Sequence, residues 1–369
     1  MIPVNEPWLG AEEAELAREA VASGWISGQG KYVQTFEQRW SEQCGRRHGI
    51  SVSSGTAALE TAVHALGLPR GSEVILPSFT MISCVAAILR NDLVPVFVDA
   101  DSCTWCMDVN QVGHRLTARS SAIMAVHIYG HPVEMDALLE LGRTRGLKII
   151  EDAAEAHGAL YRGRPCGSFG DASAFSFYSN KIVATGEGGM VVCDDDAVAH
   201  DCRDYRNLYF DAQYRFTHRR LGQNYRMTNV QAAIGCAQLD RMSRALERKQ
   251  SMASRYDELL GDVPDLQLPA RSNHCDNVYW VYGVVLGDGH PFDAHELQRR
   301  LREQGVDSRP FFLGLHEQPV IREMGHAGTD RFPVTERLSR RGLYLPSGLA
   351  ISAEQIEQTA RTLKRCLGC

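Results

Sequence analysis

Lys181 is a single amine between an apolar, strand-like segment and a glycine-rich turn, in residues 175–189 (FSFYSNKIVATGEGG). A buried ammonium is costly, so such a lysine either extends its amine to water or is held near neutrality for reaction with a carbonyl group. The segment alone leaves two interpretations open. The lysine is either an ordinary residue of a strand-to-turn connection or one that forms a Schiff base.

Two other segments add a carboxylate and a phosphate-binding turn. Residues 147–152 have the pattern of a short buried strand that ends in an acidic pair, which places Asp152 where open α/β sheets bind their ligands. Residues 53–59 are small and polar and then become helical, so we expect a helix to begin at residues 54–56. The backbone amides and the dipole at such an end bind phosphate, although a plain N-cap has the same pattern.

A phosphate site, an acid for a ring nitrogen and a Schiff-base lysine are together the requirements of pyridoxal phosphate (PLP) chemistry. The chain also resembles the PLP-dependent sugar-nucleotide aminotransferases of fold type I, in the aspartate aminotransferase superfamily, and most closely the members that act on GDP sugars. The stretches that carry the resemblance are residues 24–28 (GWISG), 54–58 (SGTAA), 77–80 (PSFT), 126–132 (VHIYGHP), 151–158 (EDAAEAHG), 175–189, 224–233 (NYRMTNVQAA), 308–312 (SRPFF) and 345–348 (LPSG).

The resemblance implies an α/β fold with two domains. A large PLP-binding domain, with a mostly parallel sheet between helices and an N-terminal substrate segment, is expected at residues 1–240. A smaller α+β C-terminal domain is expected at residues 241–369.

The pattern of the chain agrees with this fold. Strand-like and helical stretches alternate, which predicts a parallel sheet covered on both faces. The predicted strands are residues 73–77, 94–99, 122–127, 147–152, 172–177, 189–194 and, in the small domain, 278–286. Helices are predicted at residues 135–145, from 229 onward and at 246–260.

The resemblance also assigns roles around the cofactor. Lys181 forms the Schiff base and carries the proton of the transamination, and Asp152 pairs with the pyridine nitrogen. Ala154 packs on a ring face, and Glu155 has the position that hydrogen-bonds the phenolic oxygen. The implied phosphate contacts are Gly55, Thr56, Ala57 and Ser176. Asn224 reaches the phosphate from the neighbouring subunit, which implies a homodimer.

One position departs from the family pattern. At Met81 many members carry an aromatic residue that stacks on the cofactor ring, whereas methionine offers a polarizable and less shape-specific contact. The ring is therefore covered either by Met81 itself or by Phe79. Because a histidine at the position of Lys181 marks the related sugar dehydratases, the lysine favours transamination over dehydration.

The expected partners are a nucleotide-sugar substrate and L-glutamate as the amino donor, with no metal. Substrate contacts are expected from Ser27, His127, Tyr129, Arg309, Phe311 and His316. Arg309 is the best founded of these, since a bidentate guanidinium suits a diphosphate or the carboxylate of the donor.

Three functional hypotheses stay open. The first is amination of GDP-4-keto-6-deoxymannose. The second keeps the chemistry on another sugar of antibiotic or polysaccharide biosynthesis: GDP-mycosamine (amination at C3), a GDP-linked lincosamide octose or dTDP-4-keto-6-deoxyglucose. The third is a non-catalytic PLP-binding regulatory or assembly subunit, which the intact Lys181, Asp152 and Thr56 disfavour.

Composition excludes some functions. With 369 residues the chain is long enough for two domains, and its net charge of −6 offers no basic surface for nucleic acid. Neither a signal peptide nor a membrane-spanning run is recognisable, so we expect a cytoplasmic protein. Eleven scattered cysteines give no disulfide framework. Cys103 and Cys106 have metal-binding or redox spacing but lack a second pair, which favours free thiols in a loop.

Overall fold

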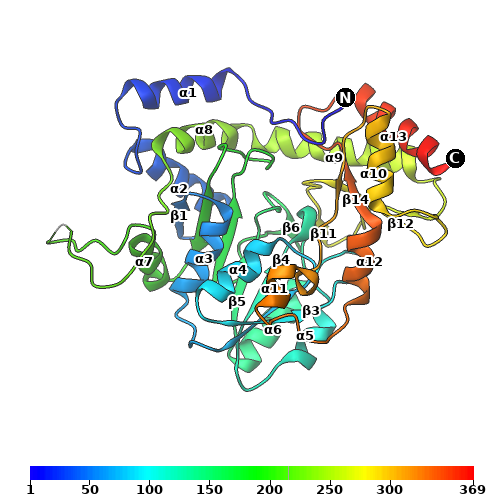
Figure 1. The fold of residues 1–369 in the computed structure, drawn as a ribbon. Coiled ribbons are helices and arrows are strands. Elements are labelled where there is room, and N and C mark those ends of the chain that lie inside the picture. The colour runs from blue at the N-terminus through cyan, green and yellow to red at the C-terminus, as the bar shows by residue number, and fades with distance from the viewer. Residues whose placement is uncertain (215) are drawn as a thin grey trace.

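The computed structural model of the protein describes residues 1–214 and 216–369. In the described residues the largest sheet has seven strands, in the order β1-β9-β8-β5-β4-β2-β3 (Figure 1). Their bounds are His48–Val52 (β1), Glu73–Pro77 (β2), Val94–Val98 (β3), Ser120–Val126 (β4), Lys148–Asp152 (β5), Ala172–Ser176 (β8) and Gly189–Cys193 (β9). Strands β3, β2, β4, β5 and β8 pair in parallel, whereas β9 is antiparallel to both of its neighbours. The predicted α/β fold with a mostly parallel sheet is confirmed.

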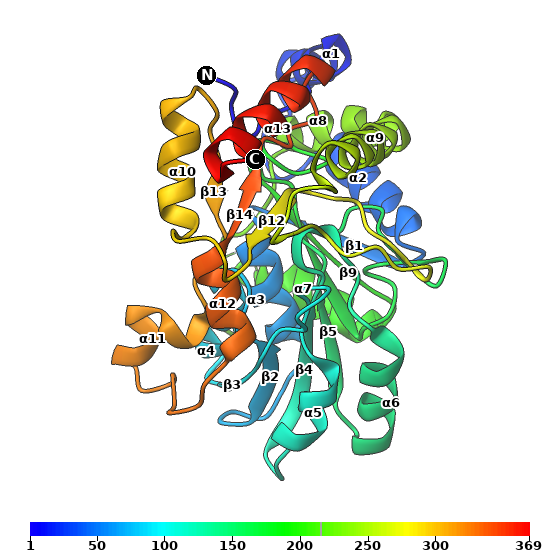
Figure 2. The same ribbon diagram turned by 90° about the vertical axis from the view of Figure 1, so that its right-hand side faces the viewer.

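Helices lie on both sides of this sheet (Figure 2). Helix α3 packs against α4 and α7, and α5 packs against α6. Their bounds are Gly55–Ala65 (α3), Ile82–Arg90 (α4), Val109–Arg115 (α5), Met135–Arg145 (α6) and Asp196–Tyr205 (α7). Strands β2, β8 and β9 are buried at every position, as expected for strands that are covered on both faces.

A layer of helices connects the sheet to the C-terminal part (Figure 1). Helices α1 (Ala11–Ala22) and α2 (Lys31–Gln43) pack against α8 (Asn229–Asp240). Helix α9 (Met242–Leu260) follows α8 and packs against the last helix, α13 (Ala353–Leu367). The change from α8 to α9 coincides with the predicted domain division at residue 240, and the division itself stays a prediction.

The C-terminal part contains an antiparallel sheet in the order β10-β12-β14-β13. The strands are Leu266–Gln267 (β10), Tyr282–Leu286 (β12), Arg309–Pro310 (β13) and Gly342–Leu345 (β14). The helices near them are Ala294–Glu303 (α10), Pro319–Glu323 (α11) and Pro333–Arg341 (α12), with the 3-10 turn Leu315–Glu317 (η2). A third sheet joins Leu160–Tyr161 (β6), Arg164–Pro165 (β7) and Cys275–Asp276 (β11), and a further 3-10 turn spans Ile128–Gly130 (η1).

The strand predicted over residues 278–286 is shorter in the structure, because β12 begins at Tyr282. Tyr279 has a left-handed backbone (φ 47°), and the amide of Val278 donates to the carbonyl of Gly130 at 3.2 Å. Residues 278–281 therefore form a connection that is hydrogen-bonded to the turn Ile128–Gly130 after β4, and this connection carries Trp280. Among the described residues, no helix is both long and apolar enough to span a bilayer.

Candidate active site

A cavity of about 380 Å³ lies where the parallel strands end and the C-terminal part covers them. The residues that line it on the side of the large sheet include Ser54, Gly55, Thr56, Met81, Val126, Asp152, Ala154, Glu155, Ser176 and Lys181. On the opposite side the lining residues are Trp280, Phe312 and Tyr344. Val126, Asp152 and Ser176 are the last residues of β4, β5 and β8, so the cavity occupies the position at which open α/β sheets bind ligands.

The N-terminus of α3 forms one wall of this cavity. The hydroxyl of Ser54 caps the helix by accepting from the amide of Ala57 at 3.1 Å. Gly55 lies so close to Ser176 that a Cβ atom on it would come within 2.6 Å of the serine Cβ. The first helical turn can therefore approach the end of β8, and its free backbone amides face the region that an anion would occupy.

Asp152 provides the carboxylate at the end of β5. Its side chain is buried, and its Oδ1 accepts from the amide of Ala154 at 3.0 Å. The turn after the strand thus fixes the carboxylate in a direction that faces the cavity.

Lys181 lies in the loop between β8 and β9, and several hydrogen bonds hold this loop in place. The amide of Phe177 donates to the carbonyl of Gly188 at 2.8 Å, and the amide of Val183 donates to Nδ1 of His157 at 3.2 Å. The Nζ atom of Lys181 lies 3.6 Å from the centroid of the Trp280 ring. Burial lowers the pKa of Lys181 despite the nearby carboxylates, which favours the neutral amine that Schiff-base chemistry requires.

Glu155 is the second buried carboxyl group of the cavity. Its Oε1 lies 3.9 Å from Nζ of Lys181, and its Oε2 accepts from the amide of Tyr129 at 2.7 Å. The amide can point at this carboxyl because Tyr129 has a left-handed backbone (φ 55°). Burial raises the pKa of Glu155 to about 7, while Lys181 acts in the opposite direction.

These residues fit PLP. An amine, a carboxylate and a helix N-terminus surround one cavity, and the buried Oδ1 of Asn180 at its edge has no hydrogen-bond partner among the described residues. Lys181 is positioned to hold the aldehyde carbon of PLP, and Asp152 is positioned to hold the ring nitrogen. The phosphate would be held by Gly55, Thr56 and Ser176. Bound there, PLP supplies an electron sink for the carbanion that forms when a proton leaves the substrate.

Of the remaining residues predicted to contact the cofactor, only Met81 lines the cavity, whereas Ala57 and Phe79 do not. Ala57 is buried under the Ser54 cap and does not line the cavity. Met81 lines it and is 46% exposed, whereas Phe79 is enclosed against Phe311 and Tyr129. Met81 is therefore a better candidate than Phe79 for the residue that packs on the cofactor ring.

Asn224 is exposed and lies outside the cavity of its own chain. The neighbouring Tyr225 accepts through its carbonyl from the amide of Ser53 at 2.7 Å, so this segment runs beside the start of α3. The predicted role of Asn224 in a partner's site stays a prediction.

The predicted substrate contacts do not line the cavity. His127 is fully buried, with Nε2 3.1 Å from Oε2 of Glu151. The Tyr129 hydroxyl accepts from the amide of Phe312 at 3.3 Å, and Phe311 packs 4.8 Å from the tyrosine ring, so both support the cavity wall. Ser27 and Arg309 are exposed elsewhere. Their roles as substrate contacts remain predictions.

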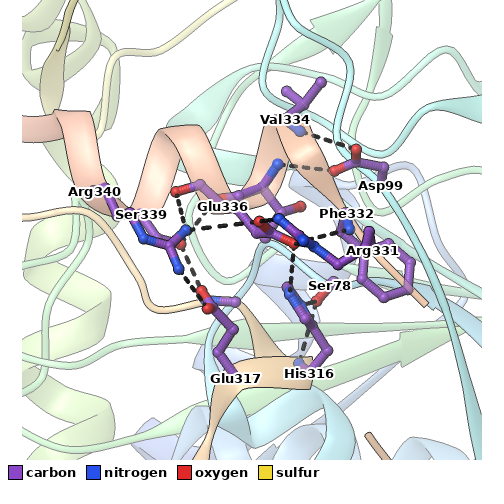
Figure 3. A network of polar contacts seen from close by, with 12 residues as sticks. Ser78, Asp99, His316, Glu317, Arg331, Phe332, Val334, Glu336, Ser339 and Arg340 are labelled. Atoms are coloured by element: carbon purple, nitrogen blue, oxygen red, sulfur yellow. Dashed lines mark hydrogen bonds and ion pairs between the residues drawn. The ribbon is translucent and has the colours of Figure 1, made fainter. Parts of the chain in front are cut away.

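His316 belongs to a separate polar network near α12 (Figure 3). Its Nδ1 lies 2.7 Å from Oγ of Ser78, and its Nε2 faces Glu336 at 3.8 Å. Arg331 binds Glu336 through two hydrogen bonds. A cavity of about 700 Å³ adjoins this network, but it lacks the lysine and the strand-end carboxylate, so the smaller cavity is the candidate active site.

Three residues that line the cavity were not predicted from the sequence: Trp280, Phe312 and Tyr344. They come from the C-terminal part, far along the chain from Lys181, and nothing in their spacing indicates that they close the cavity. Phe312 lies in the motif of residues 308–312 (SRPFF), which was the one signal for it in the sequence.

The thiols of Cys103 and Cys106 have different surroundings in the structure. Cys103 is exposed, whereas Cys106 is buried and donates through Sγ to the carbonyl of His131 at 3.2 Å. All eleven cysteines of the chain are free.

The fold and the cavity together define a PLP-dependent enzyme of fold type I. The DegT/DnrJ/EryC1/StrS aminotransferase family matches residues 7–364, and the chain belongs to that family. It is an aminotransferase, and PLP as its cofactor is confirmed with the family.

Three similar proteins illustrate the relationship. GDP-perosamine synthase of Escherichia coli O157:H7 is 38% identical over 96% of this chain and 95% of its own length. GDP-perosamine synthase of Vibrio cholerae is 36% identical, with 100% of both chains covered. The crystal structure of DesI in the presence of its TDP-sugar product has a TM-score of 0.90, with 32% identity over 100% of this chain and 92% of DesI.

Proposed function

We propose that this aminotransferase moves the amino group of L-glutamate to GDP-4-keto-6-deoxymannose and so forms GDP-perosamine. The observation that carries the proposal is the identity of 36–38% to two GDP-perosamine synthases over almost the whole chain. The cavity supports it, because one lysine, one strand-end carboxylate and one helix N-terminus meet there.

In this mechanism Lys181 is the group that moves the proton. Its amine is buried and its pKa is lowered, so its free Nζ atom would accept a proton from the carbon of the amino donor and would return one to the carbon of the sugar. Asp152 keeps the ring nitrogen protonated through a charge-assisted hydrogen bond. The amides at the start of α3 hold the phosphate, and Glu155 in its protonated form donates to the phenolic oxygen.

The aromatic wall of the C-terminal part is the proposed contact surface of the sugar. Trp280, Phe312 and Tyr344 line the cavity together with Lys181, and they exclude water from the reacting carbon. An apolar face also suits the 6-deoxy carbon of the sugar, which has no hydroxyl group to bind.

A second candidate keeps the chemistry and changes the sugar or its nucleotide. The observation in its favour is the likeness to DesI, whose structure contains a TDP-sugar product, at 32% identity over the whole chain. GDP-mycosamine, a GDP-linked octose and dTDP-4-keto-6-deoxyglucose are the corresponding alternatives.

A homodimer is part of the proposal. The segment around Asn224 leaves large apolar side chains in water, with Tyr214 66% and Leu221 94% exposed. Trp25 and Ile26 are also more than half exposed. We propose that a second copy of the chain covers these apolar side chains.

We also propose a cytoplasmic location and a division of the chain into two domains. Eleven free cysteines suit a reducing compartment, which supports a cytoplasmic location. The passage from α8 to α9 supports the division into residues 1–240 and 241–369.

The test follows the absorption of the bound cofactor in the purified protein. Glutamate should convert the Schiff-base band to that of the amine form, and GDP-4-keto-6-deoxymannose should restore it with formation of an amino sugar nucleotide, identified by mass. Restoration by dTDP-4-keto-6-deoxyglucose alone would favour the second candidate. No response of the band to glutamate would favour a non-catalytic PLP-binding subunit, with Lys181→Ala as the reference for a protein that cannot form the Schiff base.

A further inference from the structure

A buried thiol lies directly behind the carboxylate of the active site. Cys84, in the first turn of α4, is fully buried, and its Sγ lies 3.0 Å from Oδ2 of Asp152. Because an ionised carboxylate only accepts hydrogen bonds, the thiol is the donor. The two residues are 68 positions apart in the sequence, so the fold alone brings them together.

The thiol is itself part of a short line of donors. Oγ1 of Thr80, which is also buried, lies 3.4 Å from Sγ of Cys84. Since the thiol proton points at Asp152, the threonine hydroxyl donates to the sulfur. The second carboxylate oxygen of Asp152 accepts from the amide of Ala154, so each oxygen of the carboxylate has a hydrogen-bond partner of its own.

The surroundings also define what Cys84 does not do. Burial, together with the charge of Asp152, raises the pKa of the thiol well above its ordinary range. Cys84 is thus a neutral donor throughout the working pH range and has no thiolate for nucleophilic or redox chemistry.

Other buried cysteines have different contacts. Cys202 and Cys236, for example, direct their thiols at the backbone carbonyls of Thr61 and Tyr32. Within the described residues, Cys84 is the thiol whose hydrogen bond ends on a carboxylate of the candidate active site.

We propose that Cys84 is a positioning residue for the transamination: its thiol fixes the Asp152 carboxylate in the orientation that faces the ring nitrogen of PLP. This inference rests on the proposed function, in which Asp152 keeps that nitrogen protonated. A carboxylate held on one side only can rotate about its side-chain bonds, and the ring nitrogen then loses a partner of fixed geometry.

The proposal is tested with three variants. Cys84→Ala removes the donor, Cys84→Ser restores a donor of similar size, and Cys202→Ala is the matched control, since it removes an equally buried thiol away from the cavity. For Cys84→Ala we expect kcat to fall roughly tenfold, because the loss of a hydrogen bond to a charged group costs at least the free energy that corresponds to this factor. The KM for glutamate should change less than about twofold. Cys84→Ser should recover kcat to within about threefold of the wild type.

Two further readouts separate positioning from loss of stability. The pH titration of the cofactor's absorption should shift in Cys84→Ala, return in Cys84→Ser and stay unchanged in Cys202→Ala. In the protein without cofactor, the S–H stretching band that disappears in Cys84→Ala should move to higher frequency in Asp152→Ala, since the thiol then loses its acceptor.

The outcomes of these measurements either support or overturn the positioning role of Cys84. A Cys84→Ala protein with the wild-type titration and kcat, or an S–H band that ignores Asp152→Ala, would overturn the positioning role. Failure of the wild-type protein to respond to glutamate would instead overturn the proposed function, and the role of Cys84 with it, while the infrared result would still report the hydrogen bond itself.

Discussion

At the scale of single residues, burial in the candidate active site disfavours the charged forms of both Lys181 and Glu155. The Lys181 amine and the Glu155 carboxyl lie 3.9 Å apart, and burial shifts the pKa of each toward neutrality. The Glu155 carboxyl therefore changes its charge near neutral pH, because its pKa is about 7. A group that titrates there is suited to general acid–base catalysis and also makes the rate depend on pH.

The first prediction concerns the carboxyl group. With a pKa raised to about 7, Glu155 is a neutral donor below that pH and an anion above it, so its hydrogen bond to the phenolic oxygen is lost as pH rises. Glu155→Gln keeps a neutral amide donor at every pH. We expect kcat/KM of the wild type to decline from about pH 6 to about pH 9 more steeply than that of the variant. If the pH profiles of kcat/KM coincide for the wild type and the variant, Glu155 does not titrate in this range.

The second prediction concerns the indole above Lys181. Trp280 donates from Nε1 to the carbonyl of Asn180 at 2.9 Å and covers Nζ of the lysine at 3.6 Å. Trp280→Phe loses the hydrogen bond that orients the ring, so we expect kcat to fall roughly tenfold or more, as small displacements of catalytic groups do. Trp105→Phe is the control, because Nε1 of that buried indole has no partner in the described part of the chain. Equal losses in both variants would point to a general packing defect.

At the scale of elements, the end of β5 carries two consecutive acidic residues whose side chains have different surroundings. Asp152 faces the cavity, whereas Glu151 points to the other face of the sheet and is fully buried. The Glu151 carboxylate accepts from the amides of Gly167, Phe169 and Gly170 and from the hydroxyl of Ser173, at 2.7–2.9 Å. This set of donors fixes the loop that leads from β5 to β8.

The third prediction follows from these donors. Burial alone would raise the pKa of Glu151, but the bonds from His127 and the backbone amides outweigh it and lower the pKa to about 2. Because this folded-state pKa is below the ordinary 4.5, the stabilisation is complete above about pH 4.5 and is lost as pH falls toward 2. Glu151→Gln should lower the free energy of unfolding by about 3 kcal/mol at neutral pH, and by less at pH ~3.

Urea denaturation at both pH values measures this difference. The exposed Glu323 provides the control variant Glu323→Gln, which should leave the stability nearly unchanged. A gap between wild type and Glu151→Gln that is independent of pH would contradict the assignment of the low pKa.

The residues of the candidate site show which of its features could be predicted from the sequence. Lys181, Asp152 and the start of α3 were predictable, because strand ends and helix ends have local patterns. His127 was predicted as a substrate contact from the family resemblance, and in the structure its Nε2 lies 3.1 Å from Oε2 of Glu151. Trp280 and Cys84 could not be predicted, since their contacts with Lys181 and Asp152 depend on how distant segments pack.

At the scale of the whole molecule, the cavity is completed by parts of the chain that fold on different sheets. Lys249 of α9 is buried and donates to the carbonyls of Trp280, at 2.8 Å, and Ser347, which fixes the C-terminal part to the long helix. The cavity wall therefore depends on the packing of the two parts of one chain. The proposed dimer extends this dependence to a second chain, because Asn224 is exposed and lies outside its own cavity.

The fourth prediction tests this extension with two inactive variants. Lys181→Ala lacks the Schiff-base lysine but retains Asn224, and Asn224→Ala has the opposite defect. If Asn224 acts in the partner's site, a mixed dimer has one site with both residues intact and one with neither, so random exchange of subunits should restore activity to about a quarter of the wild-type level.

The control for this experiment mixes Lys181→Ala with a chain that carries both substitutions, in which no arrangement yields an intact site. Sedimentation velocity on the same samples reports whether mixed dimers form. No gain of activity in mixed dimers would place Asn224 in the site of its own subunit, whereas a gain that vanishes in the control requires two chains to build one active site.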